Sequence, residues 1–260
     1  MENQVIVLTG GGSGIGKATA LLCAEKLGAR LAVLDVDESA AMDVAEEAVS
    51  RGAPHAIGVG CDVSDETRVE KAFERSEVEF GAPDGVFANA GIDIGGLEHE
   101  LSYETWERVL STNLSGVFLT CKHALRAMLG AGKGGSIVCT SSPAASVALA
   151  AGGTGAYSAS KGGVSALVRC LAIDYARHGI RVNAVAPGAT ETPLMWANVP
   201  EDERDRMREQ INSEVPLGRL ADPAEIGQAV LWLLSDASAY VTGSHLVCDG
   251  GILAKGSISV

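Results

Sequence analysis

Short apolar runs alternate with longer amphipathic stretches along the whole chain, and this alternation strongly limits how the chain can fold. Seven runs have the length and composition of buried strands: 4–9, 30–35, 55–60, 85–88, 136–140, 181–185 and 244–248. Helical patterns lie between them, at 14–27, 38–49, 65–80, 103–129, 156–177 and 224–234. Strands that are apolar on both faces are typical of parallel sheets covered by helices on both sides. The sequence therefore predicts an α/β fold, a doubly wound domain with a central parallel sheet of about seven strands.

Length and composition fit one such domain. The chain has 260 residues, of which 47% are hydrophobic, so we expect a single domain over 1–260. The first strand begins at about residue 4, which leaves no room for a signal peptide. No apolar run is long enough to cross a bilayer. We therefore expect a cytoplasmic protein that does not interact with membranes.

Charge and metal-ligating residues exclude other classes of function. The formal net charge is −13, which opposes binding to nucleic acid and to anionic membranes. The six cysteines and five histidines are scattered without the spacing of metal ligands. We expect no metal site and no nucleic-acid partner.

The first strand runs directly into a glycine-rich turn with Gly10, Gly14 and Gly16, followed by a helical pattern. Glycines let the backbone approach a pyrophosphate closely, and the start of a helix favours negative charge. Three residues separate the first two glycines, whereas the common dinucleotide fingerprint has one. The pattern predicts a cofactor-binding turn, and a tight turn without a ligand is the alternative.

A tyrosine and a lysine, Tyr157 and Lys161, stand one helical turn apart behind a serine pair at Ser141 and Ser142. Free tyrosine titrates near pH 10, so a phenol acting as a base near neutral pH needs its phenolate stabilised by roughly 3 to 4 kcal/mol. A cation four residues away on the same helix face can supply much of this. The spacing predicts a tyrosine base with a lowered pKa, although by itself it also fits a solvated helix face.

Taken together, the motifs resemble the short-chain dehydrogenase/reductase family in order and approximate spacing, over essentially the whole chain. They are the glycine turn, Asn89-Ala90-Gly91, the serine pair, Tyr157 with Lys161, and Pro187-Gly188. The resemblance implies an NAD(P)-binding Rossmann domain. It also implies hydride transfer between a nicotinamide cofactor and a small-molecule hydroxyl or carbonyl substrate.

The resemblance implies four catalytic residues. Tyr157 is the general acid/base that takes the alcohol proton, and Lys161 holds the nicotinamide ribose and lowers the tyrosine pKa. Ser142, just past the end of a strand, fits the family serine better than Ser141 and would hydrogen-bond the reacting oxygen. Asn113 corresponds to the asparagine that kinks the long helix and binds a water linking Lys161 to solvent. A helical polar residue satisfied by the backbone is the alternative for Asn113.

Asp35, at the end of the second strand, favours one of the two nicotinamide cofactors. A carboxylate there can accept hydrogen bonds from the adenosine ribose and would repel a 2′-phosphate. Neither Ser13 nor Val36 is the cation that family members using NADP often carry at these positions. The sequence predicts NAD, with NADP less favoured. The alternative is that Asp35 only caps the following turn.

Other cofactor contacts follow from the resemblance. Asp62 and Val63 would lie at the adenine, the Asn89-Ala90-Gly91 motif would border the cofactor cleft, and Thr192 would contact the carboxamide. The full predicted set is Gly10, Ser13, Gly14, Ile15, Gly16, Asp35, Asp62, Val63, Asn89, Ala90, Gly91, Tyr157, Lys161, Pro187, Gly188, Thr190 and Thr192.

The segment 190–223 breaks the strand–helix rhythm with three prolines and a charged run, and we interpret it as a substrate lid. A solvated surface helix is the alternative. The loop 144–155 carries no charge, which favours a neutral substrate. An apolar ceiling at Leu194, Met195 and Trp196 would suit a cyclic alcohol, and the alternative is that these residues form the core of the lid. Polar residues Asp93, Glu98 and His99 would instead suit a sugar or polyol.

The leading hypothesis is an NAD-dependent dehydrogenase that oxidises a secondary alcohol, whether cyclic alcohol, polyol or sugar, to the ketone or lactone. One alternative is an NADPH-dependent carbonyl or 3-oxoacyl reductase, which Asp35 and the acidic composition disfavour. Another is a non-catalytic NAD-binding regulator, against which the four catalytic residues argue together. The family resemblance implies a homotetramer built on helices 103–129 and 156–177, and a monomer with these apolar stripes buried is the alternative.

Overall fold

Seven strands form one sheet in which every neighbouring pair is parallel, and a computed structural model describes it over residues 4–149 and 152–255. The spatial order is β3-β2-β1-β4-β5-β6-β7. The strands are β1 (Val5–Thr9), β2 (Arg30–Asp35), β3 (Ala56–Gly60), β4 (Gly85–Ala88), β5 (Gly135–Thr140), β6 (Ile180–Pro187) and β7 (His245–Cys248). The expected parallel sheet is confirmed. Its order reverses beside β1, where β4 follows β3 in the chain but crosses to the other side.

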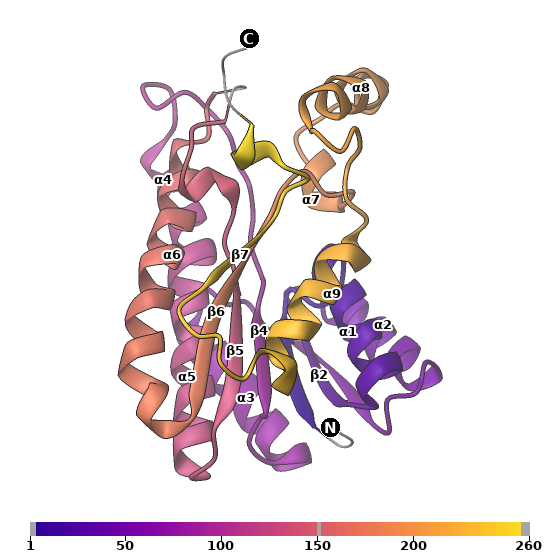
Figure 1. The fold of residues 1–260 in the computed structure, drawn as a ribbon, viewed down its shortest axis with the longest axis vertical. Helices are drawn as coiled ribbons and strands as arrows, with labels where there is room; N and C mark the ends of the chain where they lie inside the picture. Colours follow the sequence, from indigo (N-terminus) through magenta and orange to yellow (C-terminus); the bar gives the residue numbers. More distant parts are fainter. Residues whose placement is uncertain (1–3, 150–151, 256–260) are drawn as a thin grey trace.

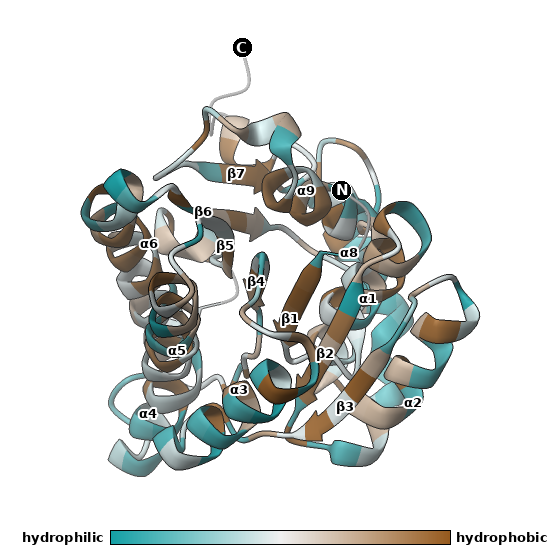
Figure 2. Cartoon of the chain, turned by 90° about the horizontal axis from the view of Figure 1, so that it is seen from below, coloured by the Kyte–Doolittle hydropathy of each residue, from teal (hydrophilic) through white to brown (hydrophobic). Residues whose placement is uncertain are grey.

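Helices cover both faces of the sheet (Figures 1 and 2). One layer contains α1 (Gly14–Leu27), α2 (Glu38–Ser50) and α9 (Pro223–Leu234). The opposite layer contains α3 (Glu66–Phe80), α5 (Gly116–Gly130) and α6 (Gly155–Tyr175). The two layers and the sheet between them form one doubly wound domain. Among the described residues, no helix has the length and apolar character needed to cross a bilayer.

Each face of the sheet has its own apolar core. Successive side chains of a strand point to opposite faces, so Val5 and Val7 of β1 join one core while Ile6 and Leu8 join the other. All four side chains are almost completely buried. Burying a side chain of this size stabilises the fold by about 1.5 to 3 kcal/mol. The central strands are therefore apolar on both faces, as the sequence pattern indicates.

The long helix expected over 103–129 is divided into two. It consists of α4 (Tyr103–Leu110), a π-helical turn (Ser111–Ser115) and α5. Asn113, in the π turn, is fully buried and binds the main chain of Ile92 on both sides. Its Oδ1 accepts from the Ile92 N–H at 2.8 Å and its Nδ2 donates to the Ile92 carbonyl at 2.8 Å. The widened turn lets Asn113 point at the loop after β4.

The segment after β6 stands away from the body of the molecule, at the end of the sheet where the strands point (Figure 1). It contains α7 (Pro193–Trp196) and α8 (Arg204–Glu214). Short 3-10 turns complete the described structure at Pro143–Ala145, Ala176–His178, Glu201–Glu203, Asp236–Ser238 and Ile252–Ala254.

Candidate active site

The glycine turn between β1 and α1 adopts a shape that requires glycine. Gly10 and Gly14 have φ of 62° and 51°, in the left-handed region. A Cβ on Gly16 would lie 2.0 Å from the Gly10 carbonyl oxygen, so no side chain fits there. Ser13 precedes the helix and makes no side-chain cap bond. The helix N-terminus is thus a suitable site for a pyrophosphate.

Asn89 braces this turn from β4. Its Nδ2 donates to the Gly10 carbonyl at 3.1 Å, and its Oδ1 accepts from the Thr140 hydroxyl at 3.0 Å. Ala90 packs tightly against Gly10, because a Cβ on Gly10 would lie 2.7 Å from the Ala90 Cα. The motif after β4 therefore links the carboxyl ends of β1 and β5, which flank β4.

The Asp35 carboxylate lies beside the glycine turn. It accepts from the Gly12 N–H at 2.8 Å and from the Asp37 N–H at 3.1 Å, one bond to each oxygen. The capping role that the sequence leaves open is therefore present. A carboxylate has about four acceptor positions, so these bonds leave room for ribose hydroxyls. Val36 is 73% exposed and adds no charge.

Two predicted adenine residues follow β3. The Asp62 side chain accepts from both the N–H and the hydroxyl of Ser64, and these bonds lower its pKa. Val63 is buried against Gly116 of α5, where a Cβ would lie 2.6 Å from it. Asp62 thus shapes its own turn, and a contact with adenine stays a prediction.

Tyr157 and Lys161 lie on the first turns of α6, and Ser142 faces them from the end of β5. A side-chain hydrogen bond joins Tyr157 to Ser142. Lys161 is 2% exposed, its Nζ donates to the Thr140 carbonyl at 2.9 Å, and it lies 5.5 Å from the centre of the Tyr157 ring. Three of the predicted catalytic residues are therefore brought together.

The pKa values of this pair differ from the sequence expectation. Burial raises the pKa of Tyr157 to about 12, the hydrogen bond with Ser142 lowers it, and the Asp93 charge raises it. Burial lowers the pKa of Lys161 to about 8. The low tyrosine pKa that the spacing predicts is not found in the chain by itself. The reason is that burial disfavours the charged form of each group.

The two serines of the pair face different partners. The Ser141 hydroxyl lies 2.7 Å from the Ser165 hydroxyl of α6, away from the tyrosine. Ser142 begins the Pro143–Ala145 turn and accepts from the Ala144 N–H at 3.2 Å. This geometry favours Ser142 over Ser141 for contact with a reacting oxygen.

Asn113 and Lys161 meet at Gly91. A Cβ on Gly91 would lie 3.3 Å from the Asn113 Oδ1 and 3.6 Å from the Lys161 Nζ. Asn113 also donates to the Ser160 hydroxyl at 3.3 Å. Its side chain therefore binds protein atoms, and the water link to Lys161 stays a prediction.

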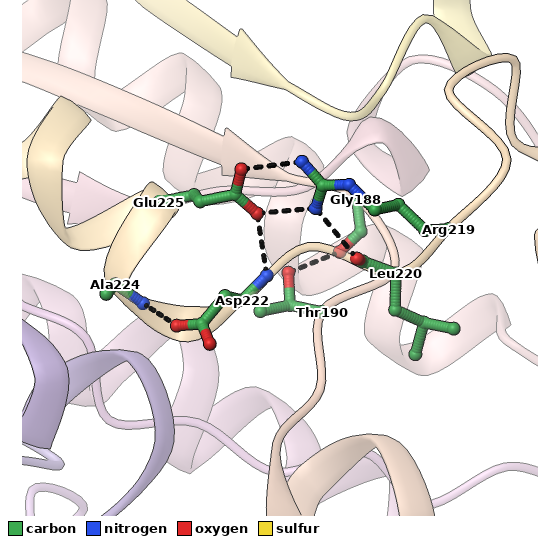
Figure 3. Close-up of polar contacts among 7 residues, drawn as sticks. All are labelled: Gly188, Thr190, Arg219, Leu220, Asp222, Ala224 and Glu225. Carbon is green, nitrogen blue, oxygen red and sulfur yellow. Dashed lines mark hydrogen bonds and ion pairs between the residues drawn. The ribbon is translucent and has the colours of Figure 1, made fainter.

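The motif after β6 reaches the glycine turn through Thr192. A Cβ on Gly14 would lie 3.2 Å from the Thr192 Cγ2, so Thr192 faces that turn. Pro187 pairs with Cys248 of β7. The Thr190 hydroxyl donates to the Gly188 carbonyl at 3.0 Å (Figure 3) and is 5% exposed. Thr190 therefore holds the turn together, while Thr192 is the residue nearer the cofactor-binding turn.

The two ends of the segment 190–223 lie side by side. Thr190 and Ala221 form a parallel bridge, with main-chain bonds from Glu191 to Ala221 and from Ala221 to Ala189, each 2.9 Å. Arg219 donates hydrogen bonds from its two terminal guanidinium nitrogens to the Glu225 carboxylate of α9, at 2.6 and 2.7 Å (Figure 3). The base of this segment is therefore fixed to the body of the molecule.

A cluster of Glu191, Trp196 and Arg208, which the sequence does not predict, links α7 and α8 to the start of the segment. Arg208 of α8 donates to both carboxylate oxygens of Glu191, and the Trp196 Nε1 donates to the same carboxylate at 2.6 Å. The guanidinium also lies 4.9 Å from the centre of the Trp196 ring. The hydrogen bond from Arg208 is the largest cause of a lowered Glu191 pKa. Sequence reasoning missed Glu191, because nothing in the pattern links residues 191 and 208.

The polar residues predicted after β4 are dispersed. His99 is exposed and pairs with Glu100 in solvent. Glu98 is exposed and lies against Gly155. Asp93 is near enough to Tyr157 and Lys161 for its charge to affect both pKa values. Of these three residues, Asp93 alone is thus a candidate for contact with a substrate. The apolar loop 144–155 includes residues 150 and 151, which lie outside the described part of the chain.

Comparison with known proteins agrees with this arrangement. A family model described as enoyl-(acyl carrier protein) reductase matches residues 10–253. The chain is 44% identical to cis-4-hydroxycyclohexanecarboxylate dehydrogenase of Sinomonas cyclohexanicum, over 96% of this chain and 97% of that protein. The chain belongs to the short-chain dehydrogenase/reductase family.

Other dehydrogenases and reductases match over nearly the same length. The 2,5-dichloro-2,5-cyclohexadiene-1,4-diol dehydrogenase of Sphingobium indicum strain UT26 is 39% identical, with 98% of each chain covered. The crystal structure of levodione reductase superposes with a TM-score of 0.92 at 34% identity, covering 98% of this chain and all of that one. As a member of this family, the protein is an oxidoreductase that uses a nicotinamide cofactor and acts on the CH–OH group of a small-molecule alcohol.

Proposed function

We propose that this protein is an NAD-dependent dehydrogenase that oxidises a hydroxyl group on an alicyclic ring to the ketone. The observation that carries this proposal is the meeting of Tyr157 with Ser142 and Lys161 at the end of the sheet, across from the glycine turn. A hydroxyl group bound there touches a proton acceptor and a hydrogen-bond donor at once.

Each catalytic residue has a distinct task in this proposal. A bound nicotinamide ring would supply the acceptor for the hydride that leaves the carbinol carbon. Ser142 holds the substrate oxygen, and Tyr157 takes its proton as the carbonyl forms. Lys161, fixed by the Thr140 carbonyl, holds the nicotinamide ribose and supplies positive charge beside the tyrosine. Asn113 keeps the Ile92 loop in place and lies within reach of Lys161.

We infer NAD rather than NADP from the charges around the ribose position. Asp35 lies against the glycine turn, and Asp37 and Glu38 follow it two and three residues later. A 2′-phosphate would have to approach these carboxylates with no cation at Ser13 or Val36 to balance its charge. The glycine cradle fits the pyrophosphate of either cofactor, so the choice rests on this acidic edge.

The substrate class follows from the pocket wall and from the relatives. Loop residues after Ser142 are small or apolar, with Val147 and Leu149 exposed by 44% and 37%. Two of the relatives are named for six-membered ring alcohols. Arg208 is paired with the Glu191 carboxylate, so its charge is already balanced. The relatives support a ring alcohol, and the uncharged loop favours a neutral one, although the alcohol named for one relative carries a carboxylate.

We propose further that the segment 190–223 acts as the substrate lid and that the protein is a cytoplasmic homotetramer. The fixed base and the Asn198 contact with the Asp93 carbonyl, at 2.8 Å, support a lid. Phe118 of α5 and Ile173 of α6 are 48% and 77% exposed, which supports an interface on these helices.

The testing experiment measures reduction of NAD and of NADP with cyclohexanol at mildly alkaline pH. We expect NADH formation at a kcat/KM at least about tenfold above that for NADP. Asp35→Ala combined with Val36→Arg should reverse this preference. Activity with NADP alone would support an NADPH-dependent reductase. If neither cofactor is reduced although NADH still binds, the proposal is contradicted.

A further inference from the structure

Asp93, in the loop after β4, brings to the catalytic residues a carboxylate that the mechanism above does not use. It follows Gly91, against which the Lys161 Nζ lies, and Ile92, whose main chain Asn113 holds. Its own carbonyl oxygen accepts from Asn198 of the 190–223 segment at 2.8 Å. The residue is therefore fixed between the floor of the site and the proposed lid.

The Asp93 side chain is incompletely satisfied. Its Oδ1 is shielded from solvent and accepts no hydrogen bond from any residue that the structure describes. Burial raises the pKa of Asp93, while the positive charge of Lys161 acts to lower it. A carboxylate with a shielded oxygen that has no donor is costly, so a bound molecule that supplies a donor to this partly exposed carboxylate gains from meeting it. Oδ1 itself becomes reachable only when the groups around it move.

Asp93 has opposite effects on the two titrating groups of the proton-transfer step. Its negative charge raises the pKa of Tyr157, which makes the base form of the phenol scarcer at neutral pH, and it also raises the pKa of Lys161, which favours the charged lysine. These effects oppose each other, so they do not by themselves account for a carboxylate at this position. Recognition of a group on the substrate is a role that does not depend on this balance.

We propose that Asp93 determines substrate specificity by accepting a hydrogen bond from a second hydroxyl group, so that the enzyme prefers a cyclic vicinal diol to the monohydric alcohol. This inference rests on the proposed function. Ser142 and Tyr157 hold the hydroxyl that is oxidised, and Asp93 holds the neighbouring one. The same carboxylate repels a substrate that carries a carboxylate at the neighbouring ring position.

The test compares kcat/KM with NAD for three ring alcohols: cyclohexane-1,2-diol, cyclohexanol and 2-hydroxycyclohexanecarboxylate. The unmodified enzyme should prefer the diol to cyclohexanol by about 10-fold to 100-fold, as expected for a hydrogen bond to a charged group. Asp93→Asn should lower the diol-to-cyclohexanol ratio of kcat/KM by about tenfold. It should also raise the kcat/KM of the hydroxycarboxylate relative to that of cyclohexanol. Asp93→Leu should abolish the preference for the diol.

Glu100→Gln is the matched control, because it removes the same charge from an exposed position in the same loop. It should leave all three ratios unchanged. NADH affinity, measured for each variant by fluorescence, checks that the cofactor site is folded. A structural defect would lower kcat/KM for all three substrates together. Loss of the Asp93 charge instead changes kcat/KM for the diol and for the hydroxycarboxylate in opposite directions.

Three outcomes overturn the inference, and they differ in what else they affect. If the unmodified enzyme shows a ratio of kcat/KM for the diol to kcat/KM for cyclohexanol near one, the inference is wrong and the proposed function is unaffected. An equal loss for all three substrates in Asp93→Asn makes the residue a partner of Lys161 instead of a substrate contact. Oxidation of none of the alcohols overturns the proposed function and the inference with it.

Discussion

Tyr157 is the residue on which the proposed chemistry depends most. Tyr157→Phe keeps the ring and removes the hydroxyl that Ser142 binds. We expect kcat to fall by about 10²-fold to 10⁴-fold, the usual contribution of a general acid/base. The affinity for NADH, followed by fluorescence titration, should stay within about twofold. A parallel loss of NADH binding would contradict a role in proton transfer.

The raised pKa of Tyr157 predicts how oxidation depends on pH. Because the pKa lies near 12 in the chain by itself, the phenol is protonated at neutral pH and the base form grows as pH rises. We expect kcat/KM for alcohol oxidation to increase between about pH 7 and pH 10. Ser142→Ala removes the hydrogen bond that lowers this pKa, so its profile should move to higher pH. A profile that moves to lower pH would contradict this assignment.

At the scale of elements, the π turn between α4 and α5 depends on one side chain. Asn113→Ala removes its three hydrogen bonds and leaves both main-chain groups of Ile92 without these partners. We expect the free energy of unfolding to fall by about 2 to 4 kcal/mol, measured by denaturant unfolding. The control is Ser111→Ala in the same turn, which loses only a local bond to the Arg108 carbonyl. An equal effect in both variants would refute the role of Asn113.

The strands are predictable from sequence because their signals are local. Apolar runs bounded by turn residues give β2 at Arg30–Asp35 and β4 at Gly85–Ala88 with the expected ends. The π turn is not predictable in this way, since its shape depends on the contact of Asn113 with Ile92, 21 residues away. The ion pair of Glu191 with Arg208 likewise joins two residues that are 17 apart in the sequence, one in the loop after β6 and one on α8.

The site shows the same division between local and distant effects. Sequence spacing brings Tyr157 and Lys161 onto one face of α6, as observed. The pKa values depend on burial in the folded chain and on Asp93, neither of which a one-turn spacing contains. Residue types therefore indicate which groups meet, while their protonation follows from the packing around them.

At the scale of the whole molecule, the exposed apolar residues of α5 and α6 predict association. Ile173→Asp places a charge on the proposed interface, and the assembly should dissociate to smaller species in analytical ultracentrifugation. Val78→Asp on α3 is the control, because Val78 is equally exposed, at 80%, on a helix outside that interface. A change of mass in both variants, or in neither, would contradict an interface on these helices.

The bridge between Thr190 and Ala221 also bears on how such a protein can diversify. Because the chain leaves and rejoins the body at one point, the stretch between these residues can be lengthened, shortened or exchanged while its anchorage stays the same. Longer loops add little to the entropic cost of closing them. Most of the cofactor half, built on β1 and α1, lies outside this stretch, and Thr192, which faces the glycine turn, is the exception. If the segment acts as the proposed lid, one oxidation chemistry can thus be retained while the range of alcohols changes through a single replaceable insert.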